Sequence, residues 1–482
     1  MGINLNLKTT NSAIAGVLAI LAQNIQDIFS QSEREDMGLE GFERKLRGVF
    51  AEAECGVVAE KLAQYDVDVP KLVLDGKNYR RVLRAASTYT CAAGEVQVTR
   101  SLYRHQAEPA IVPLDQNAGI VEGHWTPWAA RQMVVITSLL PPQTGETLFA
   151  EIGMMRPSKS SLDRLPKALN AVWEADRERF EQQLREAETI PDGTVTVAVS
   201  LDGVMTPMKD GKRQAKREQA KAEGKRPRGP AGHQEVGCGT VSFFNAQGER
   251  LQTRKLARMP EPKKKCLKRQ LQAEMEHILQ QQPDLRLMAI ADGAKDNWTF
   301  LNSAFPKATA VVDFFHAVDH LKDALDNAYG ENTPPAKAQF DKLRRRLLDE
   351  SNGVEAVIRS LRHLRKKHPR RKVIARELAY FRNNRHRMHY ADLKAQQLPI
   401  GSGVVEAACK TLVTQRMKNS GMRWRHCGGQ AILTFRALLQ SNRFDRAWPK
   451  LASTYVVPVR PPAEVIPFPK SQRTTSSEVG AI

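Results

Sequence analysis

The 482-residue sequence has few cysteines, few aromatic residues and no long apolar run. Its six cysteines are scattered without a Cys-x-x-Cys pair, a pattern typical of free thiols in a reducing cytoplasm rather than of a disulfide framework. The longest apolar run, residues 13–22, is too short to span a bilayer, and Lys8 is the only charge before it. We therefore expect a cytoplasmic protein with no membrane segment and with a buried N-terminal helix.

Acidic residues are too few to balance the basic ones. The chain has 73 Lys and Arg against 53 Asp and Glu, which gives a net charge of +20. Such an excess favours a polyanionic partner, and nucleic acid is the usual one. The charge says nothing about the fold, but a chain of this length has room for roughly two to four domains.

Three acidic residues stand out from this basic background: Asp202, Asp292 and Glu406. Each aspartate ends a short apolar run typical of a buried strand, whereas Glu406 falls in a run with helical periodicity. A carboxylate beside a core is costly unless a cation compensates it, and oxygen ligands suit Mg²⁺ or Mn²⁺. Taken singly, each Asp-Gly is an ordinary turn and Glu406 an ordinary surface residue.

The first part of the chain divides into a helical region, residues 1–70, and a small β unit, residues 71–110, with strands over 79–83, 88–91 and 95–103. The helical region has apolar residues along one face, which either pack inward or mediate self-association: Ile14, Leu18, Leu21, Ile25 and Ile28. Five arginines lie in the β unit and either contact DNA phosphates or form a solvated face: Arg80, Arg81, Arg84, Arg100 and Arg104.

Residues 120–188 have the pattern of a helix-turn-helix-like domain. A helix begins at Thr126-Pro127, a short helix over residues 145–152 stops at Gly153, and a third helix opens at Ser158. A helix-turn-helix presents its last helix to the major groove, which would expose Lys159 and Arg164 to DNA. Three packed helices without a DNA contact explain the pattern equally well.

Residues 190–315 alternate strands and helices in a defined order. Strands over 194–201, 235–245 and 249–258 precede a helix over 263–281, a strand over 285–291, a helix near 297–304 and a strand over 309–314. This β-β-β-α-β-α-β order is that of the ribonuclease H-like α/β fold. Its first and fourth strands are neighbours, so Asp202 and Asp292 would meet at adjacent strand ends.

An all-α basic insertion, residues 316–399, separates this region from its continuation at 400–450. Its cations bind a polyanion or form solvated helix faces: Arg344, Arg345, Arg346, Arg365, Lys366, Lys367, Arg370, Arg371 and Lys372. After it, Ser402 can cap a helix that Gly421 closes. Glu406 and Lys410 share one flank of that helix, so the carboxylate can face a metal ion while Lys410 faces phosphate.

Asp313, His316 and His320 form a further group at the end of the last strand. Histidines one turn apart can bind zinc, but a structural zinc site needs four ligands and no partner Cys pair is present. A hydrogen-bonded histidine pair is the favoured interpretation.

Together these motifs resemble bacterial insertion-sequence transposases of the DDE type, near the ISKra group. The likeness covers about residues 72–448. It is carried by Leu-Asp202-Gly, Ala-Asp292-Gly-Ala, Val-Asp313-Phe-Phe-His316-Ala-Val-Asp-His320-Leu, and the stretch from Gly-Ser-Gly-Val-Val-Glu406 through Met-Arg423-Trp424. Asp202 and Asp292 lie 90 residues apart, and Asp292 and Glu406 lie 114 apart with the insertion between them. The resemblance implies a ribonuclease H-like catalytic domain that cleaves element ends and joins them to target DNA. It also implies an active-site support or a DNA-contacting role for Asp313 and His316.

In-line displacement at phosphorus needs two divalent ions held by carboxylates, so Asp202, Asp292 and Glu406 are the expected catalytic residues and metal ligands. Water would attack in the first cut and a DNA 3′-hydroxyl in the joining step. The expected partners are element-end DNA, target DNA and a second copy of the chain. Residues near the glutamate helix are expected to contact DNA, with Trp424 either packing or stacking on an unpaired base: Arg416, Lys418, Arg423 and Trp424.

Two alternatives stay open: a captured transposase that only binds DNA as a regulator, and a metal-dependent nuclease of the same fold. The segment 209–228 holds nine Lys or Arg and is expected to be disordered or ordered by DNA. The tail, residues 455–482, is expected to need no structure.

Overall fold

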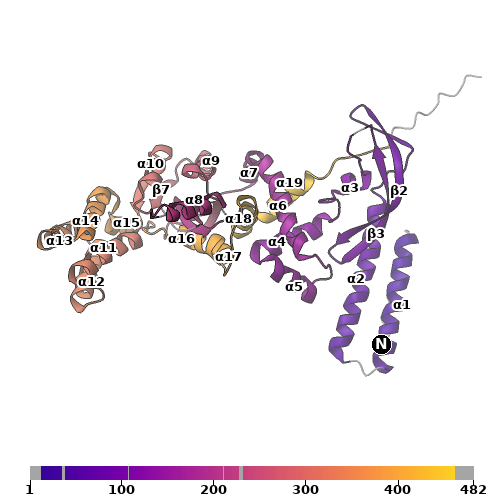
Figure 1. The fold of residues 1–482 in the computed structure, drawn as a ribbon, viewed down its shortest axis with the longest axis horizontal. Coiled ribbons are helices and arrows are strands. Elements are labelled where there is room, and N and C mark those ends of the chain that lie inside the picture. Colours follow the sequence, from indigo (N-terminus) through magenta and orange to yellow (C-terminus); the bar gives the residue numbers. More distant parts are fainter. Residues whose placement is uncertain (1–11, 35–37, 107, 210, 227–231, 462–482) are drawn as a thin grey trace, which may run out of the picture. The chain divides into compact units, whose positions relative to one another are not determined.

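The computed structural model describes residues 12–34, 38–106, 108–209, 211–226 and 232–461. The chain forms two compact units, one of Met1–Ala129 with Ala452–Ile482 and one of Ala130–Leu451. Figure 1 labels the elements of both units.

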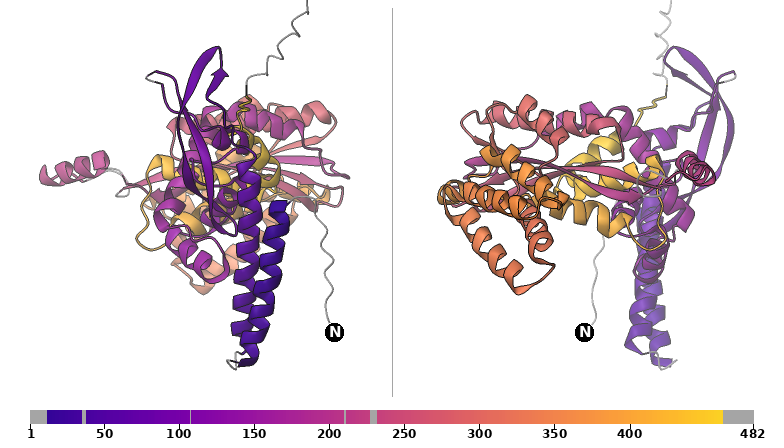
Figure 2. Two further views of the ribbon diagram at one scale, coloured as in Figure 1. Left: turned by 90° about the vertical axis from the view of Figure 1, so that its right-hand side faces the viewer. Right: turned by 60° about the vertical axis from the view of Figure 1, so that its left-hand side comes forward.

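Two long helices open the first unit as a hairpin. α1 (Ser12–Arg34) and α2 (Leu39–Ala63) lie side by side in both views of Figure 2, as the sequence predicted helices for this region. The expected burial of the first helix is wrong. Ile28 is its one fully buried apolar residue among those described, and Ile20 is 63% exposed. One helix covers only one side of another, so much of the apolar surface of α1 faces solvent.

One stretch among the described residues, Ser12–Ser32 in α1, is long and apolar enough to cross a membrane. Core helices of soluble proteins and N-terminal signal sequences meet the same criterion. The uninterrupted apolar run at residues 13–22 is shorter than this stretch, because polar Gln23 and Asn24 end the run while the helix continues. The expected absence of a membrane segment stays a prediction.

The small β unit is a three-stranded antiparallel sheet of β1 (Lys71–Leu74), β2 (Lys77–Cys91) and β3 (Gly94–Arg104), in that order. β2 is one strand where the sequence predicted two, because its pairing with β3 continues without a break from Leu83 to Cys91.

Three arginines of the β unit pair with carboxylates. Arg84 Nε lies 3.1 Å from Asp68 Oδ2, Arg81 also pairs with Asp68, and Arg100 Nη1 lies 3.0 Å from Asp115 Oδ2. These pairs favour the structural interpretation of the arginines over phosphate binding.

The chain beyond Tyr455 returns to the first unit. Val459 is buried, and its N–H donates to Asn117 of α3 (Pro113–Ala118) at 2.7 Å. The predicted unstructured tail therefore has structure up to residue 461, and residues 462–482 lie outside the described part.

The second unit contains a five-stranded mixed sheet. Its strands are β4 (Thr196–Pro207), β5 (His233–Phe244), β6 (Arg250–Arg258), β7 (Arg286–Ala291) and β8 (Thr309–Val312). They lie in the order β6-β5-β4-β7-β8. β4 pairs antiparallel with β5 and parallel with β7, which pairs parallel with β8. The predicted strands and their sequence of appearance are confirmed.

Helices cover both faces of this sheet. α9 (Lys265–Gln281) packs closely on β5, where Cβ atoms added at Gly237 and Gly239 would meet Leu267 and Leu271 within 2.8 Å. Cys238 points to the opposite face, into a cluster with Val405 and Leu412. The alternation has the period of two that a strand buried on both faces requires. Small residues on one side of β5 thus allow α9 to approach.

The remaining elements of the second unit are helical. Those before the sheet are α4 (Pro127–Leu139), α5 (Pro142–Ile152), α6 (Lys159–Ala175) and α7 (Arg177–Glu186), close to the predicted starts at Pro127 and Ser158. Ser158 accepts from Ser161 N as the cap of α6. α10 (Lys295–Ala304) links β7 to β8. After the sheet come α18 (His426–Gln440), which packs on β6 and α6, and α19 (Phe444–Ser453).

The region between β8 and the glutamate helix is helical, as predicted. It consists of α11 (Phe314–Tyr329), α12 (Pro334–Asp349), α13 (Gly353–Lys367), α14 (Lys372–Asn384), a 3-10 turn η2 (Arg385–Arg387) and α15 (Tyr390–Ala395). Apolar residues of α11 to α15 join the core of β4, β7 and β8.

The segment 209–228 was expected to lack regular structure, and this is wrong for its middle. α8 (Gly211–Ala222) is a helix that stands away from the sheet in the left view of Figure 2. Its Lys, Arg, Gln, Glu and Ala residues are good helix formers even without an apolar face. Residues 210 and 227–228 lie outside the described part.

Four buried charged side chains tie the sheet to its helices. Arg443 donates to Glu188 at 2.6 Å and to Glu274 of α9 at 2.7 Å, and Arg254 of β6 donates to Glu274 at 3.1 Å. All four side chains are at most 5% exposed. Each buried charge is tolerated because an opposite charge compensates it.

Replacing the central cation should destabilise this unit. We expect Arg443→Met to lower the free energy of unfolding by about 3–5 kcal/mol, because Glu188 and Glu274 lose their shared partner. Arg446→Met is the matched control, since Arg446 also faces Glu188 but is 53% exposed and should contribute about 0–1 kcal/mol. Urea unfolding followed by circular dichroism measures both variants. Equal losses in the two would contradict the assignment.

Candidate metal and catalytic site

Asp202 and Asp292 lie on neighbouring strands. β4 and β7 pair in parallel up to Ser200 and Ile290, and the two aspartates follow two residues later on each chain segment. Asn297 of α10 links the two positions, because its Nδ2 donates to Asp292 Oδ1 at 3.1 Å and lies 3.4 Å from the Leu201 carbonyl. The structure therefore brings these two predicted residues side by side.

Asp202 does not end its strand, as the sequence suggested. β4 continues to Pro207 and pairs with β5 throughout, with Asp202 opposite Cys238. Next to Asp202, the parallel pairing of β4 with β7 has ended, whereas the antiparallel pairing of β4 with β5 continues to Pro207. The end of the apolar run therefore marks the end of the β4–β7 pairing and not the end of β4.

The helix that carries Glu406 packs against β4 and β5. It begins as α16 (Gly403–Ala408), continues as a π-helical segment, η3 (Cys409–Thr414), and ends as α17 (Gln415–Met417). The Cys409 thiol donates a hydrogen bond to Asp202 Oδ2, with Sγ and Oδ2 3.5 Å apart. Neighbouring Cys238, burial and Asp202 raise the pKa of the Cys409 thiol far above its usual range, so this donor keeps its proton. The glutamate helix thus contacts Asp202 directly.

Ser402 stands at the N-cap of this helix, as expected, but its side chain makes no capping hydrogen bond. Its hydroxyl donates to Glu406 Oε1 at 3.0 Å instead. The predicted closing residue, Gly421, lies in the loop after Met417 and has a φ of 74°. Serine in this position therefore orients the Glu406 carboxylate.

Asp313 joins two helix starts. Its carboxylate accepts from His316 N at 2.7 Å, as the cap of α11, and from Ser402 N just before α16. Asp313 is fully buried. Burial acts to raise its pKa, but the interactions with His316 and Ser402 outweigh it and keep the pKa below the usual value. A buried, ionised Asp313 therefore anchors the segment that carries Glu406.

His316 lies between two carboxylates. Its Nδ1 is 3.3 Å from Asp313 Oδ1 and 3.5 Å from Glu406 Oε1. The interaction with Asp313 raises the pKa of His316 to about 9, and the charges of Glu406 and Asp292 act in the same direction. His316 is therefore a cation at neutral pH and balances part of the negative charge.

Asp313, His316 and Glu406 are the one group among the described residues whose ligand atoms all lie within 4.8 Å of one another. Asp202 and Asp292 are not members of this group: Asp202 accepts from Cys409 of the glutamate helix, and the charge of Asp292 acts on the pKa of His316. Carboxylate oxygens are the ligands that Mg²⁺ and Mn²⁺ prefer. The residues present fit a hard divalent cation.

His320 is not a member of this group. Its Nδ1 lies 2.6 Å from Glu377 Oε2, and its ring stacks on Tyr380 with centroids 3.7 Å apart. The favoured interpretation of hydrogen-bonded histidines holds for His320 alone, because His316 Nδ1 is within ion-pair distance of two carboxylates but makes no hydrogen bond to the described residues. The two histidines do not converge on one ion.

Tyr380 and Gly293 belong to the site although no sequence pattern pointed to them. A Cβ at Gly293 would lie 2.2 Å from the Tyr380 ring, so only glycine fits after Asp292. The Tyr380 hydroxyl is buried without a hydrogen-bond partner. Burial and the charges of Asp292 and Asp313 raise its pKa well above the usual range. A tyrosine from α14 therefore reaches the acidic residues, which sequence spacing could not indicate.

The residues predicted to contact DNA fall into two groups. Five are on the surface: Lys159, Arg164, Lys410, Lys418 and Arg423. Arg416 is not, because its guanidinium is buried against the Thr137 carbonyl at the end of α4. Trp424 is partly buried, donates to Met417 O at 2.9 Å and packs on the cluster under β5. Of the nine basic residues named in α12–α14, all but Arg346 are exposed.

Comparisons with known proteins identify no family. No protein-family profile matches the chain, and no curated protein matches it. Among solved structures, a chain of the Drosophila P element transposase strand transfer complex is similar, with 9% identity over 69% of this chain and 82% of that chain, at a TM-score of 0.25. A likeness of this degree does not establish a shared fold or activity. Membership of the insertion-sequence transposases stays a prediction.

The anchor at Asp313 can be tested through stability. Asp313→Ala should lower the free energy of unfolding by about 1–3 kcal/mol, because two buried backbone donors lose their acceptor. Asp296→Ala, which removes an exposed aspartate paired with Lys268, should change it by less than about 0.5 kcal/mol. Thermal and urea unfolding of both variants measure the difference. An Asp313→Ala variant as stable as the wild type would show that Asp313 is no anchor.

Proposed function

We propose that the protein is a metal-dependent DNA transposase of the DDE type, with Asp202, Asp292 and Glu406 as its catalytic carboxylates. The observation that carries the proposal is the meeting of Asp202 and Asp292 on adjacent strands with the Glu406 helix packed against them. Isolated turn aspartates and a surface glutamate would have no reason to converge on one sheet.

The sheet supports a ribonuclease H-like catalytic domain. Numbered by appearance, its strands lie in the order third, second, first, fourth, fifth, and the last two run parallel to the first. That is the arrangement the ribonuclease H-like fold requires. The helices α11–α15 then form an insertion between the last strand and the glutamate helix.

In the proposed chemistry some residues hold metal ions and others orient the carboxylates. Asp202, Asp292 and Glu406 would hold two divalent cations, which when bound stabilise the attacking and leaving oxygens of an in-line displacement. Ser402 and Asn297 orient Glu406 and Asp292 by hydrogen bonds.

Neither cleavage nor joining needs a nucleophile from the protein. In the first step a water oxygen forms a bond to phosphorus while the bond to the 3′-oxygen breaks and leaves a 3′-hydroxyl. In the second step that 3′-hydroxyl attacks a target phosphodiester and the target's own oxygen leaves.

The surface charge supports DNA as the substrate. The net charge of +20 attracts phosphates over the whole chain, and α12–α14 and their connections carry many exposed Lys and Arg. Element-end DNA, target DNA and further copies of the chain are the proposed partners. Inverted repeats flanking the gene would supply the cognate end sequence.

Single carboxylate variants test the proposal. Asp292→Asn and Glu406→Gln should each reduce Mg²⁺- or Mn²⁺-dependent nicking and joining of cognate end DNA by at least about two orders of magnitude, because the transition state loses several kcal/mol of charge stabilisation. DNA binding without metal should change little. Chelation of the metal should stop the reaction of the wild type.

Glu235→Gln is the matched control. Glu235 is a half-exposed carboxylate near β4 that pairs with Lys264, outside the proposed metal site. It should retain activity. Tight end binding without any cleavage would favour a DNA-binding regulator, and hydrolysis of RNA hybrids or branched DNA in preference to duplex would favour a nuclease. Both outcomes count against the transposase.

A further inference from the structure

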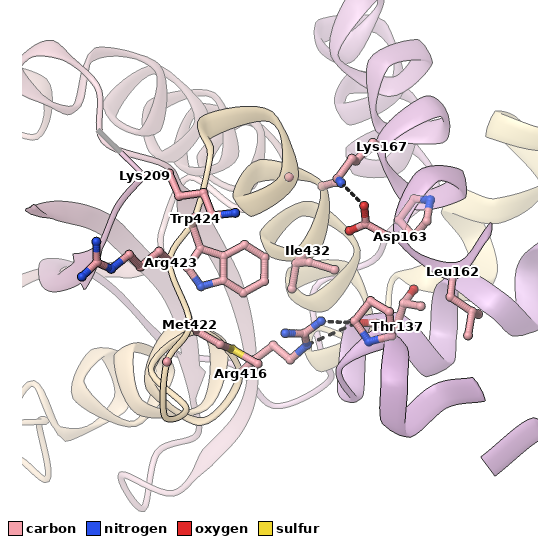
Figure 3. A pocket seen from close by; sticks show the side chains of 15 residues that line it. Thr137, Leu162, Asp163, Lys167, Lys209, Arg416, Met422, Arg423, Trp424 and Ile432 are labelled. Carbon is pink, nitrogen blue, oxygen red and sulfur yellow. Dashed lines mark hydrogen bonds and ion pairs between the residues drawn. The ribbon is translucent and has the colours of Figure 1, made fainter. Parts of the chain in front are cut away.

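A cavity of about 280 Å³ lies beyond the carboxylates in the same unit. Figure 3 shows its walls: Arg416 and Trp424 from the end of the glutamate helix and the following loop, Ile432 from α18, Leu162 from α6, and Lys209 after β4. Ten residues separate Glu406 from Arg416, which corresponds to about 15 Å along a helix. The cavity therefore neighbours the proposed catalytic site without including it.

Arg416 brings an incompletely compensated charge to this cavity. Its Nε and Nη2 donate to the Thr137 carbonyl at 3.2 and 3.0 Å, where a cation stabilises the C-terminus of α4. Nη1 is buried and has no hydrogen-bond partner. Burial and the charge of Arg436 lower the pKa of Arg416 to about 10, so it still carries its proton. An anionic or polar ligand in the cavity would compensate a buried donor of this kind.

Trp424 provides a fixed aromatic wall. Its backbone bonds to Pro207 and Lys209, and its indole N–H is occupied by the Met417 carbonyl. The Arg416 guanidinium lies 5.3 Å from the centroid of the indole. Because the polar atom of the indole is already satisfied, the ring offers its apolar surface to the cavity, beside the aliphatic side chains of Ile432 and Leu162 (Figure 3).

Cations surround the opening. Lys209 and Arg423 line the cavity and are exposed, whereas Lys167 is paired with Asp163 at 2.5 Å. An aromatic wall beside a buried guanidinium and a basic rim combines the two properties that a nucleotide demands, a surface for the base and donors for the phosphate. The volume of about 280 Å³ is near the lower end of small-molecule sites, which run from about 300 to 1,000 Å³, and so favours one nucleotide over a base pair.

We propose that this cavity receives a single unpaired nucleotide of the bound DNA, with its base against Trp424 and its phosphate toward Arg416 and the rim cations. The inference rests on the proposed function, since it specifies how that DNA is held. An unpaired nucleotide near the cut would fix the register of the end relative to Asp202, Asp292 and Glu406.

Gly428→Leu tests the cavity without removing its charged or aromatic groups. Gly428 lines the cavity in α18, and a Cβ there meets only the flexible end of Lys167, at 3.1 Å. Leucine also favours a helix over glycine. The variant should fold and fill the space. Gly48→Leu in α2, where nothing lies within 4 Å of the added Cβ, is the control.

The probe is a 30-base-pair duplex with one extra unpaired 2-aminopurine nucleotide, compared without divalent metal with the same duplex fully paired. The wild type and Gly48→Leu should bind the first about ten-fold more tightly, with quenching of the 2-aminopurine fluorescence by stacking. Gly428→Leu should bind both duplexes equally and without quenching. Lys209→Gln combined with Arg423→Gln should weaken the preference as a second variant that leaves the core intact.

Two results overturn the inference in distinguishable ways. Equal binding of the two duplexes by the wild type, or a preference retained in Gly428→Leu, removes the nucleotide cavity and leaves the transposase proposal standing. Failure of the wild type to bind either duplex or to cleave cognate end DNA removes both.

Discussion

Parallel pairing between β4 and β7 determines where the acidic residues lie. The pairing ends at Ser200 and Ile290, and the two strands then leave Asp202 and Asp292 next to each other at the edge of the paired region. Asn297 bridges the gap they leave, and the Glu406 helix covers the face of β4 on which Asp202 and Cys409 meet. The helical region between β8 and α16 can be long because both of its ends return to Asp313.

The site contains more carboxylates than cationic side chains. Asp313 is buried and ionised, and Asp202, Asp292 and Glu406 lie nearby with His316 as the one imidazolium among them. His316 offsets part of the negative charge, and solvent screens part of the rest because the Glu406 side chain is 43% exposed. A divalent cation is the proposed partner of the remaining charge. At the cavity beside Arg416 the sign is reversed, and the proposed partner is an anion.

Much of the fold follows from local pattern. Apolar alternation, glycine positions and caps such as Ser158 predicted the strands of the second unit and most helix starts, because these signals act within a few residues. The site depended on contacts that local pattern cannot encode. Ser402 serves Glu406 rather than a helix end, Tyr380 arrives from α14, and the π-helical turn at Cys409–Thr414 changes which side chains follow Glu406. Arg416 resembled a phosphate contact in the sequence and is buried, because its partner is a carbonyl 279 residues away.

The central claim is that Asp202, Asp292 and Glu406 share one cation centre. Titration of the full chain with Mn²⁺ by isothermal calorimetry, without DNA, measures this directly. Asp202→Asn, Asp292→Asn and Glu406→Gln should each weaken Mn²⁺ binding by at least about ten-fold relative to the wild type. Binding that Asp202→Asn and Asp292→Asn leave unchanged while Glu406→Gln abolishes it would assign the ion to Asp313, His316 and Glu406 alone and contradict the shared centre.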